Sequence, residues 1–590
     1  MRDLLTLAER TGFQETGRSD EVERLCAAFA AEWPRTVRAL EFGRSAEGRS
    51  MRALLVSRSG TLDARELRER RIPVLMLQAG IHPGESDGKD AGFIALRKLL
   101  GETPAAGDPL ERQAILFVPA FNTDGHERVG RWNRPNQNGP QITGWRATAQ
   151  NLNLNRDHTK ADAPEMRALL ALVARFEPLI CADLHVTDGA DFEPDVSLQV
   201  EPINQGDPAL HASGRELRDR LIERLTRQGS LPLAFYPDFV ETDNPASGFV
   251  LTVYSPRFST GYFPQRNRFT VLVETHSWKP YAHRVAVTVN TILALAELNA
   301  QHGGGWLEQA RSADRAACSL GGAPLVLDYR SGWREPTAVG KESAAAHDSA
   351  AAREPAAGSA EAAELIDFRG YAYRREPSEL SGAPMTIYDP GTPQIWRVPY
   401  RSRIEPTITA LAPRHGYLLP RAYAAEIVPR LECHGIALEA APSQLAPLEE
   451  FRAQRVSFAS QPFEGRMRAS ICGAWGRLAR DIAPGALLVP IAQPLARLVV
   501  ALLEPEAPDS FAAWGFFNGC FEQKEHLEPY VAEQIARSVL ASHPELKAAF
   551  DARLAADAAF RNDPAARLTF FWRHHPSWDE RYNCYPIYRC

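Results

Sequence analysis

Short apolar runs alternate with stretches of helical period between about residues 71 and 300. The runs are apolar on both faces and bounded by turn residues, which is typical of central strands covered by helices on both sides. They are Val74–Gly80, Ala114–Asn122, Leu179–His185 and Phe269–Glu274. Amphipathic stretches such as Asp90–Leu100 and Ala163–Phe176 lie between them. This pattern predicts an α/β fold, a three-layer helix/sheet/helix sandwich with a mixed, mostly parallel sheet.

Two local signals add detail to this fold. The helix predicted at Ala163–Phe176 has a start signal, because Asp162 can cap it, Pro164 suits its first turn and Glu165 follows the cap by three residues. Upstream, Val37–Arg58 holds two strand-like halves around a glycine turn, which predicts a hairpin at the sheet edge.

The character of the chain changes after about residue 300. Short segments rich in aromatic and β-branched residues, separated by proline turns, predict a β-rich second domain. They are Leu325–Arg330, Asp367–Arg375, Met385–Asp389 and Gln394–Tyr400. We therefore expect two domains. The first, at 1–304, is large enough for an enzyme core, and the second, a β-rich accessory domain at 305–590, packs on it.

Four further segments of the second half have distinct patterns. Residues 341–363 are alanine-rich with almost no large apolar side chain, which predicts a flexible surface loop. Helical periodicity returns over about His526–Ala566, and the aromatic end Tyr582–Cys590 is expected to dock on the domain. The apolar stretch Ala486–Leu503 contains two prolines and is predicted to be buried strands rather than a membrane span.

Composition limits the classes of function. The 590 residues are 44% hydrophobic and 24% charged with a net charge of −6, so a soluble globular protein is expected, and no basic excess indicates a nucleic acid or membrane partner. Eight scattered cysteines without a paired motif indicate free thiols, Cys584 and Cys590 included. The first residues show no signal-peptide pattern, so a cytoplasmic location is expected. The oligomeric state stays open.

Candidate chemistry lies at the ends of the predicted strands. His82 and Glu85 follow the first run, His185 ends the third and Glu274 ends the fourth. In an open α/β sheet the carboxyl ends of the strands form one rim, where these four side chains can converge. Zn²⁺ accepts an imidazole and carboxylate pair together with a third ligand and a water.

Five motifs in the chain occur in an order that resembles the zinc carboxypeptidase family, the carboxypeptidase A-like metallopeptidases, over about residues 20–300. They are HPGE at 82–85, NTDG at 122–125, NLNRD at 153–157, DLH at 183–185 and the strand-terminal Glu274. The resemblance implies that His82, Glu85 and His185 bind one zinc ion. It also implies that Glu274 is the general base and acid of the reaction.

The resemblance further implies a set of residues that bind the substrate. Asn155 and Arg156 would hold the terminal carboxylate, for which the planar guanidinium of arginine is suited. Arg134 would stabilise the oxyanion, with Arg131 as the alternative. The tyrosine that family members carry on a mobile loop is assigned here to Tyr262, in SPRFSTGYFPQRNR.

The chain also departs from the family pattern. Asn153 occupies a position where many members have an aspartate that orients a zinc-bound histidine; its amide oxygen can still accept the imidazole N–H. Asp183 either compensates from two residues before His185 or makes only local hydrogen bonds. Tyr254 is the second candidate for the tyrosine. Arg257 is either a surface residue or a recognition residue for acidic side chains.

Other histidines have open or structural interpretations. His276 and His126 are either second contacts of the site or plain loop residues. His574 and His575, near the two terminal cysteines, match no usual zinc spacing and are assigned to a structural aromatic tail.

Three functions are compared on this basis. The first is a zinc-dependent carboxypeptidase that removes the C-terminal residue of a peptide. The second keeps the metal site but hydrolyses N-acyl amino acids, as aspartoacylase-like relatives do; both substrates carry a free carboxylate, so Arg156 does not separate them. The third is a metal-free binding module on the same fold, which the presence of every ligand and the base disfavours.

Overall fold

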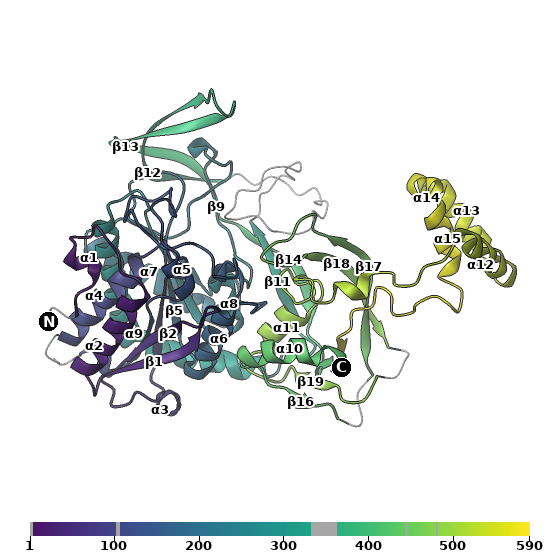
Figure 1. Cartoon of the computed structure of the whole chain (residues 1–590), viewed down its shortest axis with the longest axis horizontal. Helices are drawn as coiled ribbons and strands as arrows, with labels where there is room; N and C mark the ends of the chain where they lie inside the picture. Colours follow the sequence, from purple (N-terminus) through teal and green to yellow (C-terminus); the bar gives the residue numbers. More distant parts are fainter. Residues whose placement is uncertain (1–3, 102–106, 332–362, 443–446, 479–481) are drawn as a thin grey trace.

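The computed structural model describes residues 4–101, 107–331, 363–442, 447–478 and 482–590 (Figure 1). Its largest sheet has eight strands in the order β1-β2-β4-β3-β5-β10-β6-β7. The strands are β1 Val37–Arg44, β2 Ser50–Val56, β3 Val74–Ala79, β4 Ala114–Val118, β5 Ile180–Val186, β6 Val196–Glu201, β7 Pro232–Leu233 and β10 Phe269–Thr275. The central pairs β3–β4, β3–β5 and β5–β10 are parallel, whereas β1–β2, β2–β4 and β6–β10 are antiparallel. The mixed sheet with a parallel centre and the edge hairpin β1–β2 are as predicted.

Helices cover both faces of this sheet. On one face lie α2 Ser19–Glu32, α4 Asp87–Gly101, α7 His211–Arg227 and α9 Tyr281–Ala317, and on the other lie α3 Ala64–Glu69, α6 Pro164–Phe176 and α8 Ser259–Gln265. Consecutive side chains of a strand divide between the two faces, since Leu75 and Leu77 pack with the first group and Met76 with the second. The three-layer sandwich is therefore confirmed. Two short helices, α1 Leu7–Arg10 and α5 Thr123–Glu127, complete this half.

The start of α6 differs from the prediction. Its N-cap is Ala163, and the Asp162 carboxylate does not cap it but pairs with Arg466 and Arg430 at 2.6 and 2.9 Å. Asp157 accepts the backbone N–H groups of Asp162 and Ala163 instead. The cap prediction was wrong because the arginines that take Asp162 are distant in sequence.

A long hairpin of the second half joins the first half. β12 Glu364–Pro377 pairs with β13 Pro384–Arg401, and β13 adds to β9 Phe249–Val250, which pairs with β8 Asp238–Phe239. The predicted short strands Met385–Asp389 and Gln394–Tyr400 are thus one strand. Its register shifts where Pro390 and Pro393 lie, so these prolines are tolerated at an irregularity of the ladder. A separate pair joins β11 Pro324–Ser331 to β14 Ile404–Leu411.

A six-stranded sheet forms the rest of the second half's core. Its order is β16-β19-β15-β20-β17-β18. The strands are β15 Gly416–Leu419, β16 Glu439–Ala440, β17 Glu449–Phe458, β18 Ala469–Arg477, β19 Leu487–Pro490 and β20 Tyr588–Arg589, with α10 Arg421–Cys433 and α11 Ala496–Leu503 beside them. The chain end docks through β20 as expected. Ala486–Leu503 is mostly buried, but only Leu487–Pro490 is a strand and Ala496–Leu503 is a helix, because a short apolar run does not distinguish a strand from a buried helix.

One hydrophobic core crosses from the first half of the chain to the second. Met166 and Phe176 of α6 belong to the same cluster as Tyr417 of β15 and Val499 of α11. The α9 helix also continues past residue 304, so the predicted boundary lies inside a helix; the division into domains stays a prediction. Residues 341–362 of the alanine-rich insert lie outside the described residues.

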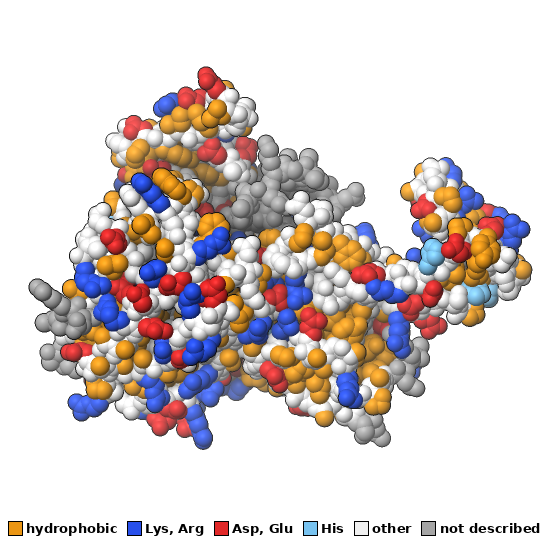
Figure 2. All heavy atoms as spheres, viewed as in Figure 1, with side chains coloured by type: hydrophobic (Ala, Val, Ile, Leu, Met, Phe, Trp, Pro, Cys, Tyr) orange, Lys and Arg blue, Asp and Glu red, His pale blue; other side chains and the backbone are white. Residues whose placement is uncertain are grey.

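The terminal helices form a module of their own. They are α12 Pro529–Ser542, α13 Leu546–Ala556, α14 Ala558–Asn562 and α15 Pro564–Trp572, as the periodicity predicts. They share a small separate core and project from the rest of the molecule (Figure 1). Figure 2 shows basic and acidic side chains interspersed over the visible face, in keeping with the small net charge. Among the described residues, no helix has both the length and the apolar content needed to cross a membrane.

Candidate metal centre and active site

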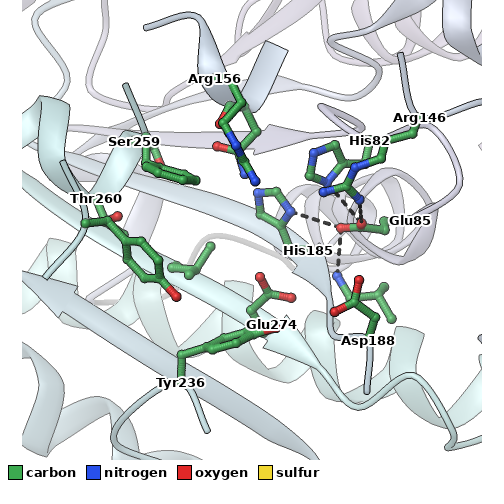
Figure 3. A pocket seen from close by; sticks show the side chains of 15 residues that line it. His82, Glu85, Arg146, Arg156, His185, Asp188, Tyr236, Ser259, Thr260 and Glu274 are labelled. Atoms are coloured by element: carbon green, nitrogen blue, oxygen red, sulfur yellow. Dashed lines mark hydrogen bonds and ion pairs between the residues drawn. The ribbon is translucent and has the colours of Figure 1, made fainter. Parts of the chain in front are cut away.

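Three side chains with ligand atoms converge at the ends of β3 and β5. His82 and Glu85 lie in the turn between β3 and α4, and His185 lies in β5. One ligand atom from each lies within 4.8 Å of the others. His82 Nδ1 is 3.0 Å from Glu85 Oε1 and His185 Nδ1 is 2.9 Å from Glu85 Oε2, with both rings turned toward the carboxylate (Figure 3).

The far nitrogen of each ring lies beside an oxygen atom, in a hydrogen bond for His82 and at ion-pair distance for His185. His82 Nε2 lies 3.1 Å from Asn153 Oδ1, and His185 Nε2 lies 3.1 Å from Asp183 Oδ1. With only these far nitrogens protonated, the bare Nδ1 atoms face a carboxylate, and a cation between them is needed to make those contacts attractive. Two imidazoles and one carboxylate are the donor set of a catalytic zinc site with one open position. The cluster therefore fits one zinc ion.

The three candidate ligands differ in their protonation without a cation. Burial, with a contribution from Arg146, lowers the pKa of His82 to about 3, so this imidazole is neutral. Burial alone would raise the pKa of Glu85, but His82, Arg134 and His185 outweigh it and hold that pKa well below its usual value. A neutral imidazole beside an ionised carboxylate is the protonation state that binds metal. Burial would lower the pKa of His185, but Asp183 and Glu85 outweigh it and raise that pKa well above its usual value, so His185 must lose a proton when a metal ion binds.

Glu274 reaches the same pocket from the neighbouring strand. β10 pairs with β5 in parallel, and this register places Glu274 opposite His185. Figure 3 shows the Glu274 carboxylate facing His185, with Tyr236 beside it. Burial, opposed by His185 and reinforced by Glu85 and Asp188, raises the pKa of Glu274 to about 8. A carboxyl group with a pKa near neutrality can both take and return a proton.

Arg134 and a second arginine lie against the carboxylate of the metal cluster. Arg134 is 3.0 Å from Glu85 Oε1, and Arg146 is 3.4 Å from the same oxygen and lines the pocket. The alternative Arg131 is exposed and stacks on Trp132, so the structure does not bring it to the site. Sequence reasoning missed Arg146, which stands in no motif.

Asn155 and Arg156 line the pocket together. The Arg156 side chain is buried, packs over the Phe258 ring at 4.4 Å and donates to the backbone oxygen of Asn155. Over the described part of the chain, no carboxylate forms an ion pair with Arg156, and Asn155 Oδ1 is buried without a hydrogen-bond partner. Burial lowers the pKa of Arg156 to about 10, which leaves it charged at neutral pH. A buried, charged guanidinium without a counter-ion is suited to a carboxylate ligand.

The assignment of Tyr262 to the substrate site was wrong. Tyr262 is fully buried in α8, with its hydroxyl 2.8 Å from His434 Nδ1 of the second half, away from the pocket. Tyr254, the second candidate, lines the pocket together with Tyr236. Burial and nearby acidic groups raise the pKa of both well above the usual value, so both remain hydrogen-bond donors. Of the two candidates in this segment, Tyr254 lines the pocket and Tyr262 does not. Sequence spacing alone does not show which of them faces the substrate.

The remaining candidates have structural partners. Asp183 accepts from Ser259 and Gln78 as well as lying beside His185. Arg257 is buried and pairs with Asp509 of the second half, so it is no surface residue.

The other histidines and the cysteines are also accounted for. His276 lies 3.1 Å from Asp191 and stacks on Phe192, and His126 is bonded to the Asn122 backbone. His574 is exposed and His575 is half-buried. All eight cysteines are free, and the described residues hold no second metal cluster.

Comparisons with known proteins agree with this geometry. Residues 22–190 match the family model described as zinc carboxypeptidase. The chain is 25% identical to carboxypeptidase 2 of Trichophyton rubrum over 474 residues, 80% of this chain and 79% of that one. It is 30% identical to a probable carboxypeptidase 2 of Trichophyton verrucosum over 152 residues, 26% of each chain. The first alignment is too long for residues 1–304 alone and therefore includes part of the second half.

The solved structures that the chain matches include two carboxypeptidases. A metallo-carboxypeptidase from Pseudomonas aeruginosa is 16% identical, with 50% of this chain and 70% of that chain covered and a TM-score of 0.35. Carboxypeptidase A from Helicoverpa armigera is 17% identical, with 51% and 75% covered and a TM-score of 0.35.

Proposed function

Because this chain belongs to the zinc carboxypeptidase family through residues 22–190, we propose that it removes the C-terminal residue from peptides in the pocket described above. The metal ion would be held by His82, Glu85 and His185. Zinc bound there supplies a water of lowered pKa and a Lewis acid for the scissile carbonyl.

In this proposal the substrate is aligned by its terminal carboxylate. Arg156 pairs with the carboxylate through its planar guanidinium, and the side chain of Asn155 binds beside it. This contact limits the enzyme to the last peptide bond. A peptide that continued past this point would place a neutral amide beside Arg156 in place of the charged carboxylate. Tyr254 and Tyr236, both protonated, donate to the polar groups of the last residue.

Proton transfer is assigned to Glu274. Its carboxylate takes a proton from the attacking water and passes it to the nitrogen of the leaving amine, for which a pKa of about 8 is suited. Arg134 stabilises the negative charge that develops on the carbonyl oxygen; losing one such donor typically costs about a hundredfold to a thousandfold in rate.

The observation that supports this proposal most strongly is Arg156. Its charge is buried in the same pocket as Glu274 and the metal cluster, with no ion-pair partner among the described residues. Burying a charge without a partner is costly, so the site is expected to be completed by an anionic ligand.

Three matched substrates test the proposal. They are a blocked dipeptide with a free C-terminus, the same dipeptide as its C-terminal amide, and the N-acetyl derivative of the last amino acid. We expect the free acid to be cleaved and the amide to be cleaved about a hundredfold more slowly, since two charged hydrogen bonds are lost. Chelation should abolish cleavage and Zn²⁺ should restore it. Faster hydrolysis of the N-acetyl amino acid would instead assign a deacylase.

A substitution at Arg156 tests whether carboxylate binding needs the planar guanidinium or only a positive charge. Arg156→Lys keeps the positive charge but loses the planar fork, so KM for the free acid should rise about tenfold and the preference over the amide should shrink. An unchanged preference in this variant would contradict the assigned role of Arg156.

A further inference from the structure

A tight turn of the second half lies against the loop that carries the substrate-binding residues. The turn, Phe463–Arg466, follows β17 and precedes β18, and the loop, residues 151–163, precedes α6. The Glu464 carboxylate accepts the backbone N–H of Asn153 at 2.7 Å, across 311 positions of sequence. The turn therefore contacts the loop at the residue next to the metal cluster.

Asn153 connects this contact to both parts of the site. Its Oδ1 lies 3.1 Å from His82 Nε2 and accepts the backbone N–H of Asn155 at 3.0 Å. One amide side chain thus orients a metal ligand and also shapes the backbone that presents Arg156. The carboxylate of Glu464 holds the backbone of Asn153 in place, and charge-assisted hydrogen bonds of this kind are strong. The side-chain contacts of Asn153 with His82 and with the Asn155 N–H depend on that backbone position.

The backbone of Glu464 is held in an unfavourable conformation. Glu464 and Gly465 have φ of +49° and +76°, and Phe463 and Arg466 exchange two backbone hydrogen bonds across them. This is the arrangement of a type I′ turn, whose first position favours Asn, Asp or Gly rather than Glu. Strain of this kind, when retained, indicates that the side chain is needed at that place.

The turn is anchored so that it can hold this position. Arg466 binds Asp162 with both Nε and Nη2, at 2.6 and 2.8 Å, and Arg430 binds the same carboxylate. On the loop's other side, the Trp514 indole donates to Thr159 Oγ1 at 3.0 Å. The second half therefore contacts residues 151–163 at several points. Of these contacts, the one made by Glu464 falls on Asn153, the contacted loop residue nearest in sequence to Asn155.

We propose that Glu464, from the second half of the chain, is a positioning residue of the carboxypeptidase site: it holds Asn153 so that Asn155 and Arg156 face the substrate carboxylate and His82 keeps its orientation. This inference rests on the function proposed above. It deepens that function by making the second half part of carboxylate recognition. The negative charge of Glu464 also acts on Arg156 and opposes the effect of burial on its pKa.

Two substitutions of Glu464 distinguish an effect on substrate binding from an effect on the stability of the fold. Glu464→Asn suits the left-handed backbone but is too short to reach Asn153, so the melting temperature should stay equal or rise. KM for the free-acid dipeptide should rise about tenfold, the loss expected for one hydrogen bond to a charged group, with zinc content unchanged. Glu464→Gln keeps an acceptor of the same length and should restore KM to within about threefold of wild type.

The chain offers a matched control. Glu177 also has a left-handed backbone, with φ of +47°, and its exposed side chain contacts no residue of the pocket. Glu177→Asn should raise or preserve the melting temperature in the same way while KM stays unchanged. A KM for Glu464→Asn within twofold of wild type, or equal KM values for Glu464→Asn and Glu464→Gln, would overturn the inference. A wild-type enzyme that does not prefer the free acid over the amide would overturn the proposed function instead.

Discussion

Glu85 and Glu274 are two carboxyl groups in one pocket with opposite pKa shifts. Histidines and Arg134 hold the pKa of Glu85 well below its usual value, whereas burial raises that of Glu274 to about 8. Neighbouring groups therefore leave one carboxyl permanently ionised, as a metal ligand must be, and leave the other able to exchange a proton near neutrality. The two carboxyl groups differ in environment and not in residue type, and this difference suits the roles of ligand and base that we propose for them.

Replacing Glu274 tests this division. Glu274→Gln keeps the shape but cannot take a proton, so kcat should fall about a hundredfold to ten-thousandfold while one zinc per chain remains bound. Activity assays and metal analysis on the same sample measure both. Asp188→Asn is the comparison, because it removes a carboxylate that raises the pKa of Glu274 but is not itself assigned the proton. This variant should shift the pH dependence of kcat to lower pH and lower kcat by less than about tenfold. Near wild-type activity in Glu274→Gln would contradict the assignment.

At the scale of elements, the register of β5 and β10 brings Glu274 to His185 of the metal cluster. Their parallel pairing sets Glu274 directly opposite His185, although the two residues lie 89 positions apart in the sequence. The contact between α8 and the end of α10 has a different role. There Tyr262 and the backbone oxygen of Thr159 enclose His434, which joins the two halves of the chain.

The His434 contact predicts a pH-dependent stability. Burial lowers the pKa of His434 to about 3, so the folded chain stays neutral there while the unfolded chain binds a proton near pH 6.5. The contribution of His434 to the free energy of unfolding is then complete above pH 6.5. It falls as the pH drops toward 3, by up to about 1.4 kcal/mol per pH unit for this one group. Urea unfolding at pH 7.5, 6 and 5 should show a smaller loss with pH in His434→Gln than in wild type. Equal pH dependence in the two proteins would contradict this.

At the scale of the molecule, the two halves share one core and the terminal helices do not. Side chains of α6 pack in the same cluster as β15 and α11, while α12–α15 enclose a separate small core. Salt bridges of Asp162 and Arg257 with the second half add polar contacts around the site. We therefore expect the second half to fold together with the first half.

Deletions test this division of the molecule. A chain that ends at residue 320 exposes the apolar face beneath α6 and is expected to be insoluble or inactive. Replacing residues 524–577 by a short glycine-serine linker should leave zinc content and KM unchanged, because only the separate core is removed. Solubility, calorimetry and the dipeptide assay measure both. A folded, active fragment of about 300 residues, from truncation or from limited proteolysis, would show that the halves are independent.

Residues close to a strand end were predictable, and residues that depend on distant partners were not. His82, Glu85, His185 and Glu274 were found because each follows or ends an apolar run, and parallel strands end at one rim. Tyr262 was misassigned because loop spacing does not say which side a ring faces. Arg146 stands in no motif and became a pocket residue only through folding.

The sequence by itself determined the α/β class of the first half, its four central strands and edge hairpin, the order of the motifs and the donor set for zinc. These depend on periodicity and on residue types within a few positions of one another, where local physics acts. Tertiary structure alone decided that the second half shares the core, that Asp162 binds arginines rather than capping α6, and that Glu464 reaches Asn153. Such contacts join segments up to about 300 residues apart, and they form because burial and charge pairing are settled by packing in three dimensions.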